Sequence, residues 1–154
     1  MADKRPPLAD AASILAALGV TAPPIDTYRV ARQLGIEVQE GPHPWASSLD
    51  LRGEGPVIWL AGFLRSDQKQ FAIAHGIGHL ALHTKGSPQV LWHDMTFTGT
   101  PEEREANQFA AELSMPSRMV IRAFLENASL AKTAAMFGVS TLAMRYRLQN
   151  LGQL

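Results

Sequence analysis

Hydrophobic and polar positions along the chain follow two periods, one typical of helices and one typical of strands. Apolar residues recur at helical spacing over residues 8–18, which predicts a first amphipathic helix. Asp26 has a side chain suited to cap a second helix, which is predicted to run to Leu34. Residues 36–38 then have the composition of a short strand.

The sequence pattern changes over residues 41–61, where turn-forming residues separate short apolar runs. Residues 47–52 alternate, residues 53–55 read Gly-Glu-Gly, and residues 56–61 are an apolar run rich in strand-forming side chains. This pattern predicts a hairpin and a small, mostly antiparallel sheet. Residues 86–99 are predicted to form a loop.

The remaining elements are predicted to be helices. One helix starts at Ser66 or Asp67 and is apolar around much of its circumference, so we expect it in the middle of the domain. Thr100 followed by Pro101 marks the start of another, which ends near residue 114. Two or three more fill residues 117–151. The pattern predicts an α+β fold in a single domain spanning residues 1–154.

Composition restricts the chemistry. The 14 basic and 14 acidic residues balance, so no overall field marks the chain for nucleic acid or a membrane surface. From Met115 onward, however, five cationic residues face one anionic residue, which gives this end a basic bias. Cysteine is absent, so any metal site must use His and carboxylate ligands. No stretch resembles a membrane span or a signal peptide, and we expect a soluble, cytoplasmic protein.

Two histidines stand out in the central helix. His75 and His79 are four residues apart, so their side chains share one helix face and can bind one metal ion. The alternative is a pair of core histidines, but unpartnered imidazoles in an apolar helix would cost free energy. Glu105, one turn into the following helix and flanked by small residues, can approach the pair; its alternative role is a solvent-facing carboxylate.

Two segments resemble a known family in order and spacing. QFAIAHGIGHLALH at residues 70–83 and EREANQFAAELSMP at residues 103–116 are similar to the ImmA/IrrE metallopeptidases, and the resemblance covers about residues 8–120. It implies a minimal zincin-like fold and a zinc ion, or another divalent metal such as Mn²⁺, bound by His75, His79 and Glu105. Relatives of this kind cleave a helix-turn-helix repressor of the XRE type, which derepresses stress or mobile-element genes.

One position departs from the family pattern. Where that pattern is His-Glu-x-x-His, this chain has Gly76, which supplies no general base. Losing such a base typically costs about 10²- to 10⁴-fold in rate. The sequence leaves three explanations: a natural pseudo-peptidase, an engineered inactive form, or rescue by Asp94, Glu102 or Glu112. A natural Gly76 predicts that the chain binds a repressor without cutting it.

Two further histidines have open roles. His83 extends the histidine stripe by one turn and could be a fourth ligand, a packing residue or an outer hydrogen-bonding partner of the ligands. His93 could line the cleft as a catalytic or substrate contact, or be an ordinary exposed histidine.

Residues 129–151 have a helix-turn-helix pattern, with Ser140 as the cap of the second helix. As an alternative function, the chain could be a DNA-binding regulator whose peptidase-like part is a sensor or scaffold. The residues available for DNA would be Lys132, Thr141, Arg145 and Arg147. The interpretation that we favour is that these helices pack onto the peptidase-like part and complete its core.

Overall fold

The N-terminal helices begin at aspartate caps. The computed structural model describes residues 10–43, 45–83, 90–93 and 99–154, with only the backbone of residues 90–93. Helix α1 (Ala11–Ala17) starts after Asp10, whose carboxylate accepts the Ser13 N–H. Helix α2 (Thr27–Gln33) starts after Asp26, whose carboxylate accepts two backbone N–H groups. The predicted second helix and its cap are therefore confirmed, while the first helix is confirmed over its described part.

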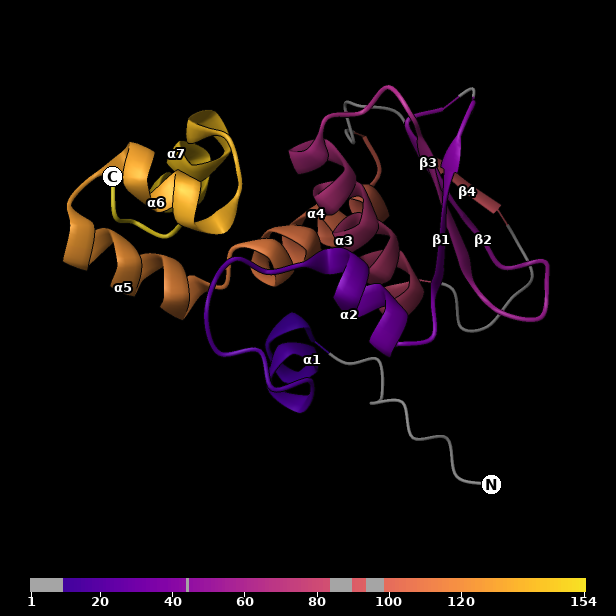
Figure 1. Ribbon diagram of the computed structural model, residues 1–154, viewed down its shortest axis with the longest axis horizontal. Coiled ribbons are helices and arrows are strands. Elements are labelled where there is room, and N and C mark those ends of the chain that lie inside the picture. Colours follow the sequence, from indigo (N-terminus) through magenta and orange to yellow (C-terminus); the bar gives the residue numbers. More distant parts are fainter. Residues whose placement is uncertain (1–9, 44, 84–89, 94–98) are drawn as a thin grey trace.

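Within the described residues, the sheet contains four strands in the order β1-β3-β2-β4 (Figure 1). Strands β2 (Ser47–Asp50) and β3 (Val57–Ala61) form the predicted antiparallel hairpin. Strand β1 (Glu37–Gly41) pairs with β3 in parallel, and β4 (Val90–His93) pairs with β2 antiparallel. The predicted loop over residues 86–99 was therefore wrong for β4. Residues 90–93 read Val-Leu-Trp-His and do not alternate, and this strand forms because the edge of β2 offers it backbone partners.

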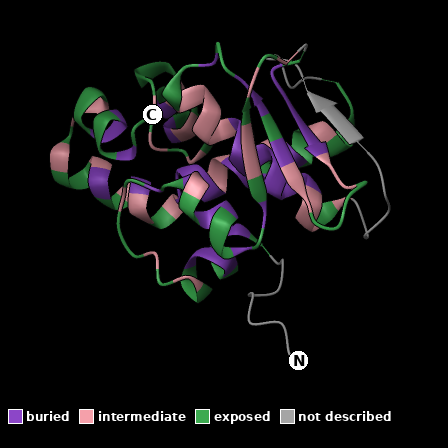
Figure 2. Ribbon diagram, turned by 45° about the vertical axis from the view of Figure 1, so that its right-hand side comes forward, coloured by how far each residue is buried: buried purple, intermediate pink, exposed green. Residues whose placement is uncertain are grey.

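Helix α3 (Ser66–Leu82) packs on one face of the sheet and is buried along residues 72–79 (Figure 2). This confirms its predicted central position. Its N-cap is Arg65 rather than Ser66 or Asp67, and Gln68 Oε1 accepts the Arg65 N–H at 2.9 Å. The sheet side chains beneath the helix, such as Ile58, belong to the same apolar core.

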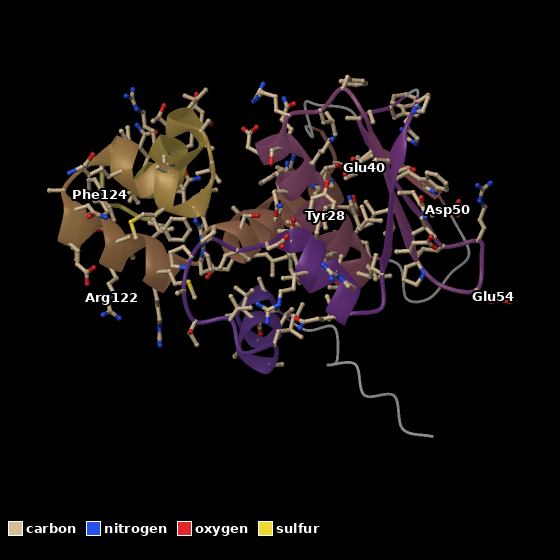
Figure 3. All side chains as sticks on the ribbon, viewed as in Figure 1. Tyr28, Glu40, Asp50, Glu54, Arg122 and Phe124 are labelled. Carbon is tan, nitrogen blue, oxygen red and sulfur yellow. The ribbon has the colours of Figure 1, made fainter. Side chains whose placement is uncertain are left out.

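One carboxylate at the side of the sheet joins three elements. The hydroxyl of Tyr28 on α2 donates to Glu40 on β1, and both side chains are labelled in Figure 3. Glu40 Oε2 also lies 3.2 Å from Lys69 Nζ on α3. These contacts hold α2 and α3 to the first strand.

Helix α4 (Pro101–Ser114) runs beside α3, and it starts as the sequence predicted. The Thr100 hydroxyl accepts the Glu103 N–H at 3.2 Å, and Pro101 occupies the first turn, where a missing N–H costs nothing. Along α4, Ala106, Ala110 and Leu113 are fully buried, so one face of this helix is apolar and the other polar.

The last three helices gather at the end of the molecule away from the sheet (Figure 1). They are α5 (Ser117–Asn127), α6 (Leu130–Phe137) and α7 (Thr141–Asn150). Instead of completing the first core, they build a second one, whose buried residues are Met115, Val120, Ala123, Ala134, Phe137, Met144 and Leu148. Met119 packs against both cores. The turn between α6 and α7 has Gly138 at φ 66° and the predicted Ser140 cap.

None of the helices in the described part of the chain is long and apolar enough to cross a lipid bilayer.

Candidate metal centre

Helix α3 presents two buried imidazoles on one face. His75 is fully buried and His79 is 2% exposed. Their ring centroids lie 4.7 Å apart and their Nε2 atoms 3.1 Å apart. The spacing of four residues therefore brings the two Nε2 atoms to one point, as the sequence predicted.

A carboxylate from α4 meets the pair at that point. Glu103 Oε1 lies 2.8 Å from His79 Nε2, and Glu103 Oε2 lies 3.0 Å from His75 Nε2. One ligand atom from each of these three residues lies within 4.8 Å of the others. The Glu103 side chain is 21% exposed while both histidines are buried, so solvent reaches the cluster on the Glu103 side.

The carboxylate beside the histidines is Glu103 and not Glu105, which the resemblance had implied. Glu105 Oε2 instead lies 3.0 Å from His83 Nε2. Two residues apart on a helix, the side chains of Glu103 and Glu105 are separated by about 200° of rotation, so only one can face the His pair. A sequence signal was present: Asn107, which also contacts His75, is four residues after Glu103 and so shares its face.

Glycine lets the two helices approach. A Cβ atom on Gly78 would lie 3.1 Å from both Cβ and Cδ1 of Phe109 and 3.2 Å from the Ala106 carbonyl oxygen. These distances are tighter than ordinary van der Waals contact. The absence of a side chain at position 78 therefore allows α4 to bring Glu103 to the histidines.

The outer nitrogen of each imidazole also has a partner. His75 Nδ1 lies 2.9 Å from Asn107 Oδ1, and His79 Nδ1 lies 3.0 Å from His83 Nδ1. Both rings therefore turn Nε2 toward Glu103. Hydrogen-bonded ligand histidines of this kind are usual at zinc sites.

The donor set fits a divalent cation. Two imidazole nitrogens and a carboxylate oxygen are the ligands of many catalytic zinc ions. With zinc–nitrogen bonds of about 2.1 Å, neighbouring ligand atoms of a tetrahedron are about 3.4 Å apart. The observed separations of 2.8, 3.0 and 3.1 Å need only a small expansion to reach this value. His75, His79 and Glu103 can therefore hold a metal.

Position 76 carries no acid or base. A Cβ atom on Gly76 would lie 2.9 Å from Ile58 Cδ1, which places this position against β3. Of the three carboxylates considered as substitutes, Glu112 is bound to Ser117 and Arg147, whose Oγ and Nη2 atoms lie 3.1 Å apart. Glu102 is exposed on the first turn of α4, and Asp94 lies outside the described residues.

The remaining candidate residues are His93 on β4 and four residues of the C-terminal helices. The backbone of His93 pairs with Ser47 in the sheet, but the His93 side chain is outside the described part of the chain. On the C-terminal helices Lys132, Thr141 and Arg145 are exposed.

Arg147 has a structural role. Its Nε donates to the Met115 carbonyl at 2.9 Å, its Nη2 lies 3.1 Å from Ser117 Oγ, and it forms an ion pair with Glu112. These contacts join α7 to the end of α4. Because Arg147 makes these contacts within the protein, we do not expect it to bind DNA.

No curated protein matches this chain significantly. The IrrE N-terminal-like domain of the M78 peptidases matches residues 31–149, a span that includes all of α3 and α4. This span covers well over half of the chain and contains the three converging residues that could hold a metal. The chain therefore belongs to the ImmA/IrrE family of peptidases.

Proposed function

We propose that this chain binds zinc through His75, His79 and Glu103 and recognises a helix-turn-helix repressor of the XRE type without cutting it efficiently. The observation that carries the proposal is the convergence of three ligand atoms next to a glycine. The centre has the ligands of a peptidase metal, but Gly76 occupies the position of the general base. Other divalent ions, Mn²⁺ among them, fit the same donor set.

The catalytic defect follows from this chain's own side chains. A bound zinc ion supplies Lewis acidity toward a carbonyl oxygen or a water molecule. Peptide hydrolysis also needs a positioned group that takes a proton from water and returns it to the leaving amine. Gly76 has no side chain that can do this. The carboxylate of Glu112, one of the possible substitutes, already binds Ser117 and Arg147. We expect a rate about 10²- to 10⁴-fold below that of a Glu-containing form.

The sheet offers a surface for an extended segment of the partner. In the described sheet, β1 and β4 are the edge strands, and each has one side without a neighbouring strand. An extended peptide can add to such an edge through backbone hydrogen bonds. Recognition of the repressor therefore does not depend on the residue at position 76.

The test restores the missing carboxylate. Because the new Cβ would meet Ile58 Cδ1 at 2.9 Å, we would compare Gly76→Glu alone with Gly76→Glu combined with Ile58→Val, which removes that atom. Each form is loaded with zinc and incubated with a helix-turn-helix repressor of the XRE type from the same genome. Cleavage is followed on gels, and binding is measured by calorimetry.

We expect the unaltered chain to bind the repressor and leave it intact, and the Glu-containing forms to cut it. A matched control adds Glu103→Ala to the Glu-containing form and should abolish cleavage. Zinc-dependent cleavage by the unaltered chain would contradict the proposal that Gly76 makes this chain inactive. Failure of every form to bind the repressor would contradict the partner.

The second core, built mainly from α5–α7, favours a second candidate function, in which these helices bind duplex DNA. A helix-turn-helix with its own core can present α7 to a groove. Its exposed polar set is small, and Leu142 and Tyr146 on the same helix are 57% and 58% exposed. Binding that weakens steeply with salt and disappears in the double variant Lys132→Ala, Arg145→Ala would support this function. Absence of binding at low salt would remove it.

A further inference from the structure

Two residues outside the three ligands form a chain of contacts that ends at one of them. His79 Nδ1 lies 3.0 Å from His83 Nδ1, and His83 Nε2 lies 3.0 Å from Glu105 Oε2. The chain runs from the protein surface inward, because Glu105 is 57% exposed in its side chain, His83 is 12% exposed and His79 is buried. Each contact in this series determines which ring nitrogen of the next histidine carries a proton.

The order of donors follows from elementary chemistry. An ionised carboxylate only accepts hydrogen bonds, so His83 must carry its proton on Nε2 to bond to Glu105. A neutral imidazole has one donor and one acceptor nitrogen, which makes His83 Nδ1 an acceptor. His79 can then bond to it only by donating from its own Nδ1. The lone pair of His79 is left on Nε2, the atom beside Glu103.

His75 reaches the same state by a shorter route. Its Nδ1 lies 2.9 Å from the amide oxygen of Asn107, which accepts a hydrogen bond and cannot donate one. The Nε2 lone pair of His75 is therefore also directed at the centre. The two ligand histidines have different outer partners, so substitutions on the His83 side change one ligand and leave the other in place.

We infer that His83 and Glu105 are positioning residues, which hold His79 in the tautomer and ring orientation that bind the metal. The inference rests on the metal centre proposed above. It also excludes His83 as a fourth ligand, because His83 meets the nitrogen of His79 on the far side of the ring from the cluster. Glu105 thereby has a role at the centre without being one of its ligands.

The first measurement is zinc affinity by competition with a chromophoric chelator, made on the full chain. His83→Ala removes the acceptor of His79, and we expect zinc to bind about 10- to 100-fold more weakly. Glu105→Ala removes only the more exposed partner, and we expect a loss of about 10-fold or less. The matched control is Glu102→Ala, which removes the same charge from an exposed position of the same helix and should leave the affinity unchanged.

The second measurement reads the protons directly. In the zinc-loaded, unaltered protein at alkaline pH, nitrogen-15 NMR of the imidazoles should show His83 protonated on Nε2 and bare on Nδ1. In Glu105→Ala the two tautomers of His83 should mix. A role limited to packing would not move this signal, and the spectrum of the unaltered protein does not depend on whether a variant folds.

The outcomes separate the two proposals. If the unaltered protein bound no zinc, the metal centre itself would be refuted. If zinc bound but both His83→Ala and Glu105→Ala kept the original affinity, only the positioning role would be overturned. A proton on Nδ1 of His83 in the zinc-loaded protein would overturn it as well.

Discussion

Gly78 lies directly against Phe109, and a methyl group at position 78 would stand 3.1 Å from two carbon atoms of that side chain. This contact sets the distance between α3, which carries both histidines, and α4, which carries Glu103. The same glycine weakens α3 by roughly 1 kcal/mol relative to alanine. The lower helix propensity of Gly78 is therefore the cost of letting α4 pack closely against α3.

Gly78→Ala should destabilise the protein despite the better helix propensity of alanine. The methyl would press on the Cβ of Phe109 and on the Ala106 carbonyl, neither of which moves easily. We expect a loss of about 1–3 kcal/mol, measured by urea unfolding, together with weaker zinc binding. Gly76→Ala is the comparison variant, because it gains the same propensity and its nearest contacts are side-chain atoms of Ile58, Cδ1 at 2.9 Å and Cγ1 at 3.2 Å, rather than a Cβ and a backbone carbonyl. Equal stability of the two variants would contradict this account of α3.

Substitution of Arg147 should lower stability much more than substitution of Arg145. Arg147 bonds to Met115, Ser117 and Glu112, whereas Arg145 is exposed. Arg147→Met should lower the free energy of unfolding by about 1–3 kcal/mol, because it leaves partly buried acceptors without their donor. Arg145→Met should change it by less than about 0.5 kcal/mol. Thermal unfolding of both variants at neutral pH measures the difference, and a larger loss from Arg145→Met would refute the structural role of Arg147.

Glu112 should make stability depend on acid pH. Burial by itself raises the pKa of this carboxyl, but hydrogen bonds from Ser117 and Arg147 outweigh burial and hold the pKa below its ordinary value of 4.5. A lowered pKa in the folded state means that the stabilisation is present above pH 4.5 and is lost as pH falls through the folded pKa. Glu112→Gln should therefore lower the melting temperature at pH 7 and make little difference at strongly acidic pH. A difference that persisted unchanged in acid would contradict this assignment.

Local signals in the sequence predicted most of the fold. The Asp26, Thr100 and Ser140 caps, the hairpin and the buried central helix depend on residues close in the chain, and the structure has all of them. Strand β4 was not predictable in this way, because its four residues pair through backbone groups of β2. The parallel pairing of β1 with β3 also depends on tertiary packing, which leaves no periodic signal in the short β1 segment.

The candidate site was predictable only where it depends on residues close together in the chain. The spacing of His75 and His79 on one helix fixes their common face, so the pair could be identified from the sequence. The choice between Glu103 and Glu105 depends on how α4 is rotated about its axis, and that rotation is set by contacts such as Gly78 with Phe109. The resemblance implied a carboxylate on α4, which is the correct helix, but it implied Glu105 where the structure places Glu103.

The most direct test of the central claim is the zinc content of purified protein in which one or the other carboxylate is replaced. We expect the unaltered chain to hold one zinc ion per molecule after dialysis and Glu103→Ala to hold almost none. Glu105→Ala, which removes the same charge two residues away, should still be filled when zinc is in excess, since Glu105 reaches the centre only through His83. Full occupancy in Glu103→Ala with loss in Glu105→Ala would contradict the assignment of Glu103 as the third ligand.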